Sequence, residues 1–346
     1  MKISILIPYY NESLNIYRTV NLIIKALENS QINVFEILIL DDGSKDLTDA
    51  LQAQLLSLTN TKLIRFEHQG RYKLRISGLE IAAYNHVLLC DARVRLAPNS
   101  LAFLLGNSAD TEMPRNGHVI FDPTAKAWMV FWESMSRIVW PQVFSRNFSQ
   151  GHINEQNFNS WPKGTGLFFA RADVLLQAMR NTQSLFHKDE LSSDDTLVLM
   201  QLARTSGILY DSSFSAYYLP RTKFSDFRSH IFERGTHAVD SFGHNLSAIS
   251  LGLGLVAVMP IFFVVALVSF RSKTLFLMYS GATAVAFLFI LSLGIALHRR
   301  LPIKHVLSLL MMLPLVAPIY LVGLYRGLGL ALYGKLGGLN NAKKTH

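Results

Sequence analysis

Polar side chains follow three apolar runs in the N-terminal part of the chain. They are Asn11-Glu12, Asp41-Asp42 and Asp91. The runs before them are short and uninterrupted, and they alternate with stretches of helical spacing, a pattern typical of parallel strands connected by helices. In an open parallel sheet the carboxyl ends of the strands meet at one edge, and ligands bind in the crevice beyond it. These carboxylates and amides are therefore expected to converge on one rim.

A basic cluster follows Gly70 and consists of Arg71, Lys73 and Arg75. Cationic groups spaced in this way can meet a diphosphate with charge-assisted hydrogen bonds. Arg75 is favoured for this contact because it is nearest the following helix. The alternative is a solvated basic loop, since runs of charge are usually surface.

Short apolar runs alternate with stretches of helical spacing around these residues. This pattern predicts an α/β domain with a mostly parallel, Rossmann-like sheet covered on both faces. Residues 110–165 are rich in aromatic side chains and are expected to form antiparallel strands and loops. The only cysteine, Cys90, allows neither an intramolecular disulfide nor a metal cluster and fits a reducing compartment.

The C-terminal part is apolar enough to enter a membrane. The mean hydropathy of the chain is +0.25, and three long uncharged runs explain it: residues 246–270, 274–297 and 306–325. Each reaches the roughly 20 apolar residues that cross about 30 Å of hydrocarbon, and none shows the polar face of a soluble helix. A transmembrane region at 246–333 is therefore expected, with a tail at 334–346.

Basic residues between the runs predict an orientation. The break at 298–305 is more basic than the break at 271–273, which favours a cytosolic second loop and, with three crossings, a cytosolic N-terminal domain. The basic tail would then lie outside, so a re-entrant third segment or a following interfacial helix stays open.

Charge also indicates the kind of partner. Residues 222–245 mix aromatic and basic side chains and predict an amphipathic segment on the bilayer surface, with a linker helix packed on protein as the alternative. The net charge of +9 favours phosphate-rich partners, namely nucleotides and lipid headgroups. No nucleic-acid-binding motif accompanies this charge, so nucleic acid is not expected as a partner.

In order and spacing, the motifs of residues 1–245 resemble the family 2 glycosyltransferases of the GT-A fold. The matching segments are Ile5-Leu6-Ile7-Pro8-Tyr9-Tyr10-Asn11-Glu12, Asp41-Asp42-Gly43-Ser44, the basic stretch from Gly70 to Gly78, Asp91, Gly164-Thr165-Gly166 and Asp194-Asp195. The resemblance implies a GT-A catalytic domain over residues 1–221 that uses a nucleoside diphosphate sugar.

The resemblance also implies a donor site at the rim. Its residues would be Pro8, Tyr10, Glu12, Asp42, Arg71, Lys73, Arg75 and Asp91. The alternative for the acidic turn is a tight strand-to-helix connection in which Ser44 or Asp46 caps a helix.

Asp91 corresponds to the first carboxylate of the family's Asp-x-Asp metal motif, which grips a divalent ion on the diphosphate. This sequence reads Asp91-Ala92-Arg93 instead, and an arginine cannot ligate a metal. Two interpretations follow. Either Asp91, phosphate oxygens and water hold Mg²⁺ or Mn²⁺, or Arg93 itself supplies the positive charge.

The acidic pair Asp194-Asp195 resembles the family's pair whose second member is the general base. Asp195 would then deprotonate the acceptor hydroxyl during inverting transfer. The alternative is a helix cap made by Ser192, Ser193 and Asp194.

Two further segments resemble acceptor-side elements. Gly164, Thr165 and Gly166 look like the loop that shapes the sugar and acceptor pocket. Arg234 stands where processive members carry Gln-x-x-Arg-Trp, and the missing Gln and Trp argue against a long-chain polysaccharide synthase. Arg234 remains a candidate phosphate contact.

Together these features predict an integral membrane glycosyltransferase of a cell inner membrane, with its catalytic domain in the cytosol. The expected reaction is inverting transfer from a nucleoside diphosphate sugar, UDP-linked in the first instance, to a lipid-linked or membrane-proximal glycan acceptor. The alternatives are a polyprenyl-phosphate sugar transferase and a non-catalytic nucleotide-binding membrane scaffold.

Overall fold

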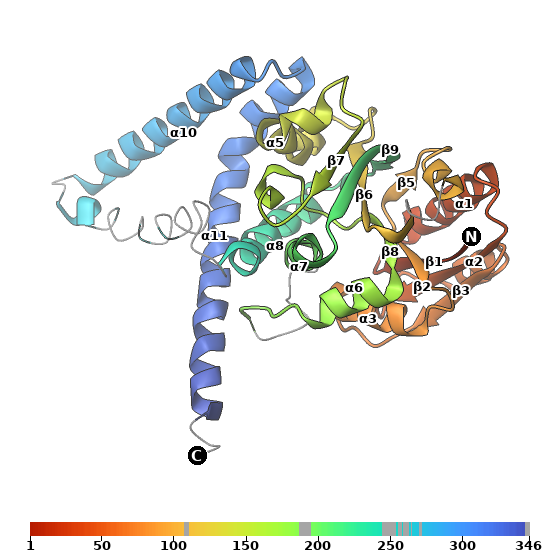
Figure 1. The fold of residues 1–346 in the computed structure, drawn as a ribbon. Helices are drawn as coiled ribbons and strands as arrows, with labels where there is room; N and C mark the ends of the chain where they lie inside the picture. Colours follow the sequence, from red (N-terminus) through yellow and green to blue (C-terminus); the bar gives the residue numbers. More distant parts are fainter. Residues whose placement is uncertain are drawn as a thin grey trace. The chain divides into compact units, whose positions relative to one another are not determined.

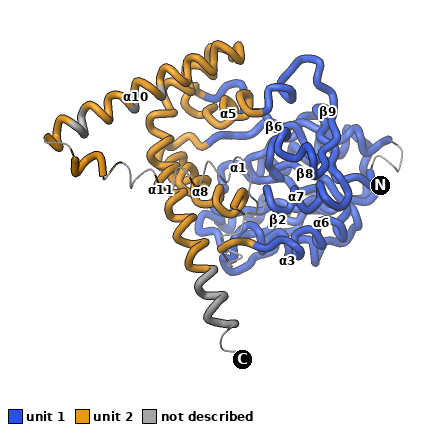
Figure 2. The backbone as a smooth tube through the Cα atoms, turned by 60° about the vertical axis from the view of Figure 1, so that its left-hand side comes forward, with its two compact units in different colours: residues 1–125, 140–183, 188–220 blue, residues 126–139, 184–187, 221–346 orange. Residues whose placement is uncertain are grey.

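The computed structural model describes residues 1–106, 111–186, 195–243, 254, 258, 263, 265–269 and 272–342 (Figure 1). The chain divides into two compact units, which Figure 2 distinguishes by colour. Unit 1 comprises residues 1–125, 140–183 and 188–220, and unit 2 comprises residues 126–139, 184–187 and 221–346.

Unit 1 opens with strands and helices in strict alternation. They are β1 (Lys2–Tyr9), α1 (Ser13–Asn29), β2 (Val34–Asp41), α2 (Asp49–Leu56), β3 (Thr61–Arg65), α3 (Arg71–Ile81) and β4 (His86–Cys90). The middle residues of β1 and β2 are buried on both faces of the sheet, which is why these strands read as continuous apolar runs. The predicted α/β class is confirmed.

The sheet has a parallel half and a mixed half. Its order is β3-β2-β1-β4-β8-β6-β9-β5, with β7 paired to β9. The pairs among β1, β2, β3 and β4 are all parallel, whereas β8 lies antiparallel to both β4 and β6. The later strands are β5 (Val94–Leu96), β6 (Arg115–Phe121), β7 (Gln150–Ile153), β8 (Leu167–Arg171) and β9 (Ile208–Tyr218).

Helices complete unit 1 after the parallel half. They are α6 (Ala172–Arg180), α7 (Thr196–Thr205) and the short 3-10 turns η1 (Ala102–Leu105), η3 (Pro141–Phe144) and η4 (Phe158–Ser160). The loop between η4 and β8 carries residues 161–166, and β8 delivers this loop to the carboxyl end of its neighbour β4.

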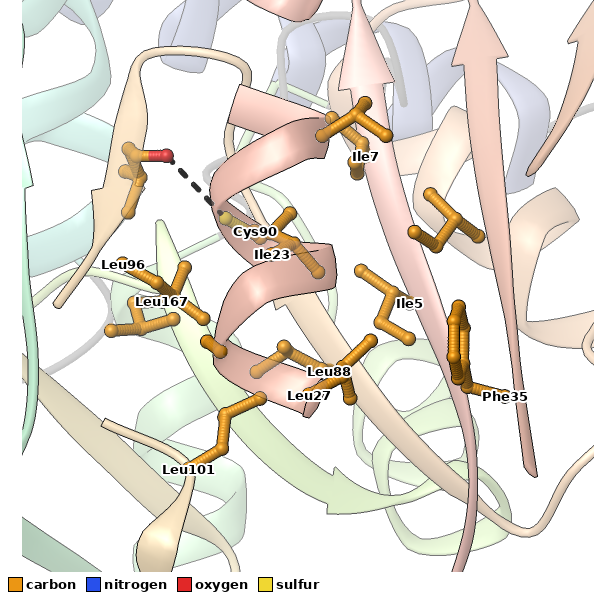
Figure 3. Packing of buried hydrophobic residues seen from close by; sticks show 14 of the residues in the cluster. Ile5, Ile7, Ile23, Leu27, Phe35, Leu88, Cys90, Leu96, Leu101 and Leu167 are labelled. Atoms are coloured by element: carbon orange, nitrogen blue, oxygen red, sulfur yellow. Dashed lines mark hydrogen bonds between the residues drawn. The ribbon is translucent and has the colours of Figure 1, made fainter. Parts of the chain in front are cut away.

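The core of unit 1 consists of two layers, one on each face of the sheet. Ile5 and Ile7 point to one face, where Ile23 and Leu27 of α1 pack against them (Figure 3). Leu6, one residue along, points to the other face and belongs to the second layer. Alternation with period 2 produces this separation. Burial of each such side chain stabilises the fold by roughly 1.5–3 kcal/mol.

Unit 2 is helical in its described part. Its helices are η2 (Ala127–Val130), α5 (Phe131–Val139), α8 (Phe224–Phe242), α10 (Lys273–His298) and α11 (Ile303–Ala342). The expectation of strands across the aromatic segment is wrong for residues 127–139, which are helical. The aromatic and methionine side chains of this segment have the helical spacing i, i+3, i+4 and i+7. They all pack in one apolar cluster and are Trp128, Phe131, Trp132 and Met135.

The apolar C-terminal runs fall differently on the described residues. Most of 246–270 lies outside them, 274–297 lies within α10, and 306–325 lies within α11. Among the described residues one helix is long and apolar enough to cross a membrane, Ile303–Gly334, which is weak evidence for a span. The third predicted segment therefore continues as helix well beyond residue 325, with Pro314 and Pro318 inside it.

Helices α8 and α11 approach each other closely through glycines. A Cβ atom added to Gly323 would lie 2.0 Å from the Phe232 carbonyl oxygen. A Cβ atom added to Gly235 would lie 2.2 Å from the Tyr320 carbonyl oxygen. The Thr236 hydroxyl donates to the Gly323 carbonyl at 3.0 Å, so the contact also satisfies a buried polar group.

We predict that Gly323→Ala destabilises unit 2 because the added methyl group meets backbone that cannot give way. Overpacking of this kind costs about 1–3 kcal/mol. The matched control is Gly329→Ala on the same helix, where an added Cβ has no neighbour within 4 Å. Thermal unfolding in detergent should show a lower Tm for Gly323→Ala alone. Equal Tm values would contradict the close helix contact.

Candidate active site

The carboxyl ends of β1, β2 and β4 lie side by side, as the parallel pairing requires. Asp41 and Asp42 at the end of β2 are both buried. Asp41 closes its own turn, because its Oδ1 accepts from the Ser44 backbone N–H at 2.8 Å and its Oδ2 lies 3.1 Å from Arg65 Nε. Gly43, with φ of 73°, supplies the left-handed conformation that this turn needs.

Asp42 reaches across to the loop before α3. Its carboxylate accepts from the backbone N–H groups of Gln69 at 2.8 Å and Gly70 at 3.2 Å, and it lies 2.9 Å from His68 Nδ1. The ring of His68 stacks on the ring of Tyr10, with centroids 4.6 Å apart and both side chains exposed. The sequence analysis missed His68, because a lone histidine in a loop carries no pattern.

The alternative for the acidic turn is that Ser44 or Asp46 caps a helix, and Asp46 does bond the start of a helix, namely α1. Asp46 accepts from the backbone N–H of Ser13, the first residue of α1, and from the Tyr9 hydroxyl at 2.6 Å. Helix α2 is capped by Thr48 instead, whose hydroxyl accepts from the Leu51 N–H. The turn is therefore fastened to the β1–α1 connection, which contains Glu12.

Arg93, at the third position of the abbreviated metal motif, points to Glu12. Its Nε donates to Glu12 Oε1 at 2.5 Å, and its Nη1 donates to the carbonyl oxygens of Leu219 and Pro220 at 3.4 Å. Arg93 thus ties the β1–α1 connection to the end of β9. Its guanidinium charge is compensated by Glu12.

Helix α3 begins at Arg71, immediately after Gly70, whose φ is 81°. At about 100° per residue, Arg71 and Arg75 lie on nearly the same face of the helix and Lys73 lies on the opposite one. Lys73 is exposed, Arg71 is half-exposed and Arg75 is buried. The sequence placed the three cations before the following helix, whereas the structure places all three on its first turns, which is why Lys73 points away from the other two.

Arg75 is the centre of the buried charge network. Only 1 % of its side chain is exposed, and its Nη2 lies 3.0 Å from Asp91 Oδ1. Its Nη1 donates to the Thr165 hydroxyl at 2.5 Å and lies 3.5 Å from Asp195 Oδ1. The diphosphate candidate of the sequence analysis is thus engaged with two carboxylates.

Asp195 precedes α7 but does not cap it through its side chain. Its Oδ1 accepts from the Thr165 backbone N–H at 3.1 Å and from the Thr165 hydroxyl. Burial raises the pKa of the Asp195 carboxyl, but Arg71, Arg75 and the Thr165 hydrogen bonds outweigh it and hold that pKa well below its usual range. Asp195 is therefore ionised at neutral pH.

Arg71 completes the network from the outside. Its Nη1 lies 3.6 Å from Asp91 Oδ2 and its Nη2 lies 3.7 Å from Asp195 Oδ2, both longer than hydrogen bonds. Half of its side chain is exposed, in contrast to Arg75. Arg71 is thus the more accessible of the two cations beside these carboxylates.

The glycines around Thr165 have different environments. A Cβ atom on Gly166 would lie 3.1 Å from Asp91 Oδ2, so the glycine permits close approach of the two segments. A Cβ atom on Gly164 would meet open space. Asp194 lies outside the described residues. Arg234 belongs to unit 2, where its guanidinium lies 4.5 Å from the centre of the Trp132 ring and donates to His230 at 2.9 Å.

The metal prediction rests on Asp91 alone. Among the described residues, no group of three His, Cys, Asp or Glu side chains gathers to hold an ion. Mg²⁺ and Mn²⁺ are commonly held by one or two carboxylates together with substrate phosphates, and Asp91, 23 % exposed, suits that mode.

Comparison with known proteins identifies the first part of unit 1. Residues 4–125 match the family "Glycosyl transferase family 2". The matched segment is a family 2 glycosyltransferase domain. It contains the acidic turn, the start of α3 and Asp91, whereas Thr165 and Asp195 lie beyond it.

Relatives of this glycosyltransferase domain agree. Chondroitin synthase of Escherichia coli is 26% identical over 168 residues, which are 46% of this chain and 24% of that enzyme. The chain thus spans about a quarter of the length of that relative. Mannosyltransferase PcManGT from Pyrobaculum calidifontis, solved with GDP-Man and Mn²⁺, shares the fold at a TM-score of 0.57 and 14% identity, covering 94% of this chain and 87% of that one.

A further solved structure is S. aureus TarS 1-349 with UDP-GlcNAc. It is 15% identical, covers 97% of this chain and 92% of that one, and has a TM-score of 0.45. The GT-A-like fold that the sequence predicted is confirmed by the likeness to PcManGT, and the glycosyltransferase class is confirmed by the family match.

We predict that the ionised Asp195 stabilises unit 1 in a pH-dependent way. Because its pKa is lower in the folded than in the unfolded chain, its contribution is complete above the ordinary value of about 3.9 and is lost as pH falls through the folded pKa. The free energies of unfolding of the wild type and Asp195→Asn, measured with denaturant, should differ by a constant amount from about pH 5 to 7 and begin to converge below about pH 4. A difference that does not change with pH would contradict the charge network.

Proposed function

We propose that this protein is a membrane-associated inverting glycosyltransferase. It would move a sugar from a nucleoside diphosphate donor, UDP-linked in the first instance, to a lipid-linked or membrane-proximal glycan acceptor. The observation that carries the proposal is the network of Arg75, Asp91, Thr165 and Asp195, because it joins the family 2 domain to an ionised carboxylate beside two arginines.

The nucleotide end of the donor is assigned to the outer part of the rim. Tyr10 and His68 present exposed aromatic rings on which a base can stack, next to the buried Asp42. Pro8 and Glu12 flank this position at the end of β1. Three observations support this assignment: the geometry of the rim, the family match, and the structure of PcManGT, which was solved with GDP-Man.

The diphosphate is assigned to Arg71 and Asp91. Arg71 is half-exposed beside the carboxylates of Asp91 and Asp195, so its guanidinium fork is placed to reach the phosphate oxygens of a bound donor. Mg²⁺ or Mn²⁺ held by Asp91 would neutralise charge on the departing diphosphate. Arg75 stays with the carboxylates and keeps them in place, and Arg93 stays with Glu12.

Asp195 is the proposed general base. An acceptor oxygen attacks the anomeric carbon, its proton passes to Asp195, and the bond to the diphosphate breaks with its electron pair leaving on the phosphate oxygen. Thr165 and Arg75 occupy Oδ1, which leaves Oδ2 on the side of the half-exposed Arg71. A carboxylate of strongly lowered pKa is a weak base, and transfer of Arg71 to the diphosphate would strengthen it.

The acceptor is proposed to be delivered at a membrane. Helix α11 carries the long apolar stretch Ile303–Gly334, and the basic break at 298–305 before it favours the cytosolic side of a cell inner membrane for the catalytic domain. Lipids and a lipid-linked glycan are the partners that this arrangement supports.

We predict that Asp195→Asn lowers sugar transfer by about 10²- to 10⁴-fold because the proton acceptor is lost. The measurement is turnover of UDP-, GDP- and dTDP-sugars by detergent-purified protein with a lipid extract as acceptor. Asp173→Asn is the matched control, an exposed carboxylate paired with Arg171 in the same unit. A nucleotide-binding scaffold would instead bind donors and turn over none in the wild type.

We predict that Arg71→Gln raises the KM for the donor by about 10- to 150-fold, since a charge-assisted contact contributes about 1.5–3 kcal/mol. Lys73→Gln is the control from the same helix, removing an exposed cation on the opposite face, and its donor KM should stay within about twofold. Equal effects of the two substitutions would indicate a diffuse basic surface instead of a specific contact.

A further inference from the structure

The loop before β8 contains a cation in apolar surroundings. Lys163 Nζ donates to the carbonyl oxygens of Phe158 and Trp161, each at 2.5 Å. The same atom lies 4.1 Å from the centre of the Phe158 ring and 5.5 Å from the centre of the Trp140 ring. Two aromatic rings and two backbone carbonyl groups therefore surround this amine, and Phe158 is buried.

Lys163 has no counter-charge in the part of the chain that the structure describes. Both recorded acceptors are neutral carbonyls, and burial alone lowers the pKa of Lys163 to about 7. Buried charges in proteins are normally paired, because desolvation of an unpaired ion is unfavourable. The buried ions at the rim follow this rule, since Arg75 lies against Asp91 and Asp195.

Lys163 is also close to the proposed base along the chain. Two residues of chain span at most about 7 Å, and Thr165, which holds Asp195, is two residues further on. Gly164 lies between them, and an added Cβ there meets open space. An acceptor beside Gly164 would bring its neutral hydroxyl to Asp195 and an anionic group on a neighbouring sugar to Lys163.

Half-buried indole rings border the same loop. Trp140 and Trp161 are both partly exposed, and Trp161 is propped by Gly151, where an added Cβ would lie 2.0 Å from the Trp161 ring. Trp140 is fixed by a hydrogen bond from its Nε1 to the Asn159 carbonyl at 3.1 Å. Flat apolar faces held in this way suit the C–H face of a sugar ring.

We propose that Lys163, with Trp140 and Trp161, forms an acceptor subsite that selects a glycan bearing an anionic group next to the sugar that receives the transfer. The anionic group, a sugar carboxylate or a phosphate, completes the charge of Lys163, and the sugar ring packs on the indoles. This inference rests on the proposed glycosyltransferase function. It adds the charge class of the acceptor.

The subsite is assigned to the acceptor because its loop contacts the proposed base. The donor diphosphate is assigned to Arg71 and Asp91, on α3 and β4. The loop with Lys163 leads into Thr165, which contacts the proposed base Asp195. The base must face the acceptor hydroxyl, so the neighbouring cation is placed to read the acceptor.

The test compares three oligosaccharide acceptors of equal length: a neutral one, one with a uronic acid, and one ending in a glycosyl phosphate. Wild type should show a kcat/KM at least about 10-fold higher for one or both anionic acceptors. Lys163→Met should remove that preference and leave the neutral acceptor within about twofold. Lys25→Met, an exposed lysine on α1, is the control and should retain the preference. The favoured anionic acceptor identifies the source of the charge.

A role for Lys163 in tying the loop alone would lower kcat/KM equally for all three acceptors, and that result would overturn the proposal. Wild type without any anionic preference would overturn it too. If Lys163→Met does not fold, Gly164→Leu takes its place, because it fills the open space without backbone strain. It should lower transfer to anionic acceptors while donor hydrolysis by water continues, and unchanged transfer would count against the subsite.

Donor hydrolysis without acceptor is measured in parallel. Absence of both transfer and donor hydrolysis in wild type for every donor would mean failure of the proposed function, whereas transfer with no preference for an anionic acceptor means failure of the subsite alone. The two failures are therefore distinguishable.

Discussion

The buried guanidinium of Arg75 is the interaction on which the rest of the rim depends. It joins three segments that are distant in the chain: helix α3, the end of β4 at Asp91, and the loop and helix that carry Thr165 and Asp195. A buried cation is normally paired with anions, and Arg75 lies against two carboxylates. The contacts of Arg75 with Asp91, Thr165 and Asp195 therefore fix the positions of these segments relative to one another. The positions of donor and acceptor groups follow from that arrangement.

The three arginines of the rim have different tasks. Arg75 is enclosed and keeps the carboxylates in register, while Arg71, one turn earlier on the same helix face, is half-exposed and can exchange them for a ligand. Arg93 is directed to Glu12 and to the end of β9. The departure from the family's Asp-x-Asp motif therefore adds a structural tie, and in the proposed function the charge opposite a diphosphate would come from Arg71 and an ion at Asp91.

The loop before β8, which is the proposed acceptor side of unit 1, is held by a different kind of interaction. Ion pairs dominate around Asp91, whereas Lys163 is held by carbonyl oxygens and aromatic rings with no carboxylate against it in the described structure. A charge balanced from within is fixed, and a charge without a partner is open to one brought by a ligand. In unit 2 the close approach of α8 and α11 is set by glycines such as Gly323.

The α/β class and the positions of Asp41, Asp42 and Asp91 at strand ends follow from the sequence alone, because the period of burial and the end of a strand are local properties. The sequence also marked the apolar stretch that became α11 by length and composition. Which charges meet depends on the folded chain. Local spacing favoured Arg75 for the diphosphate, whereas packing of α3 on the sheet buries Arg75 against two carboxylates and leaves Arg71 half-exposed. The surroundings of Lys163 could not be predicted from the sequence either, because the absence of a carboxylate beside it among the described residues depends on how distant segments pack.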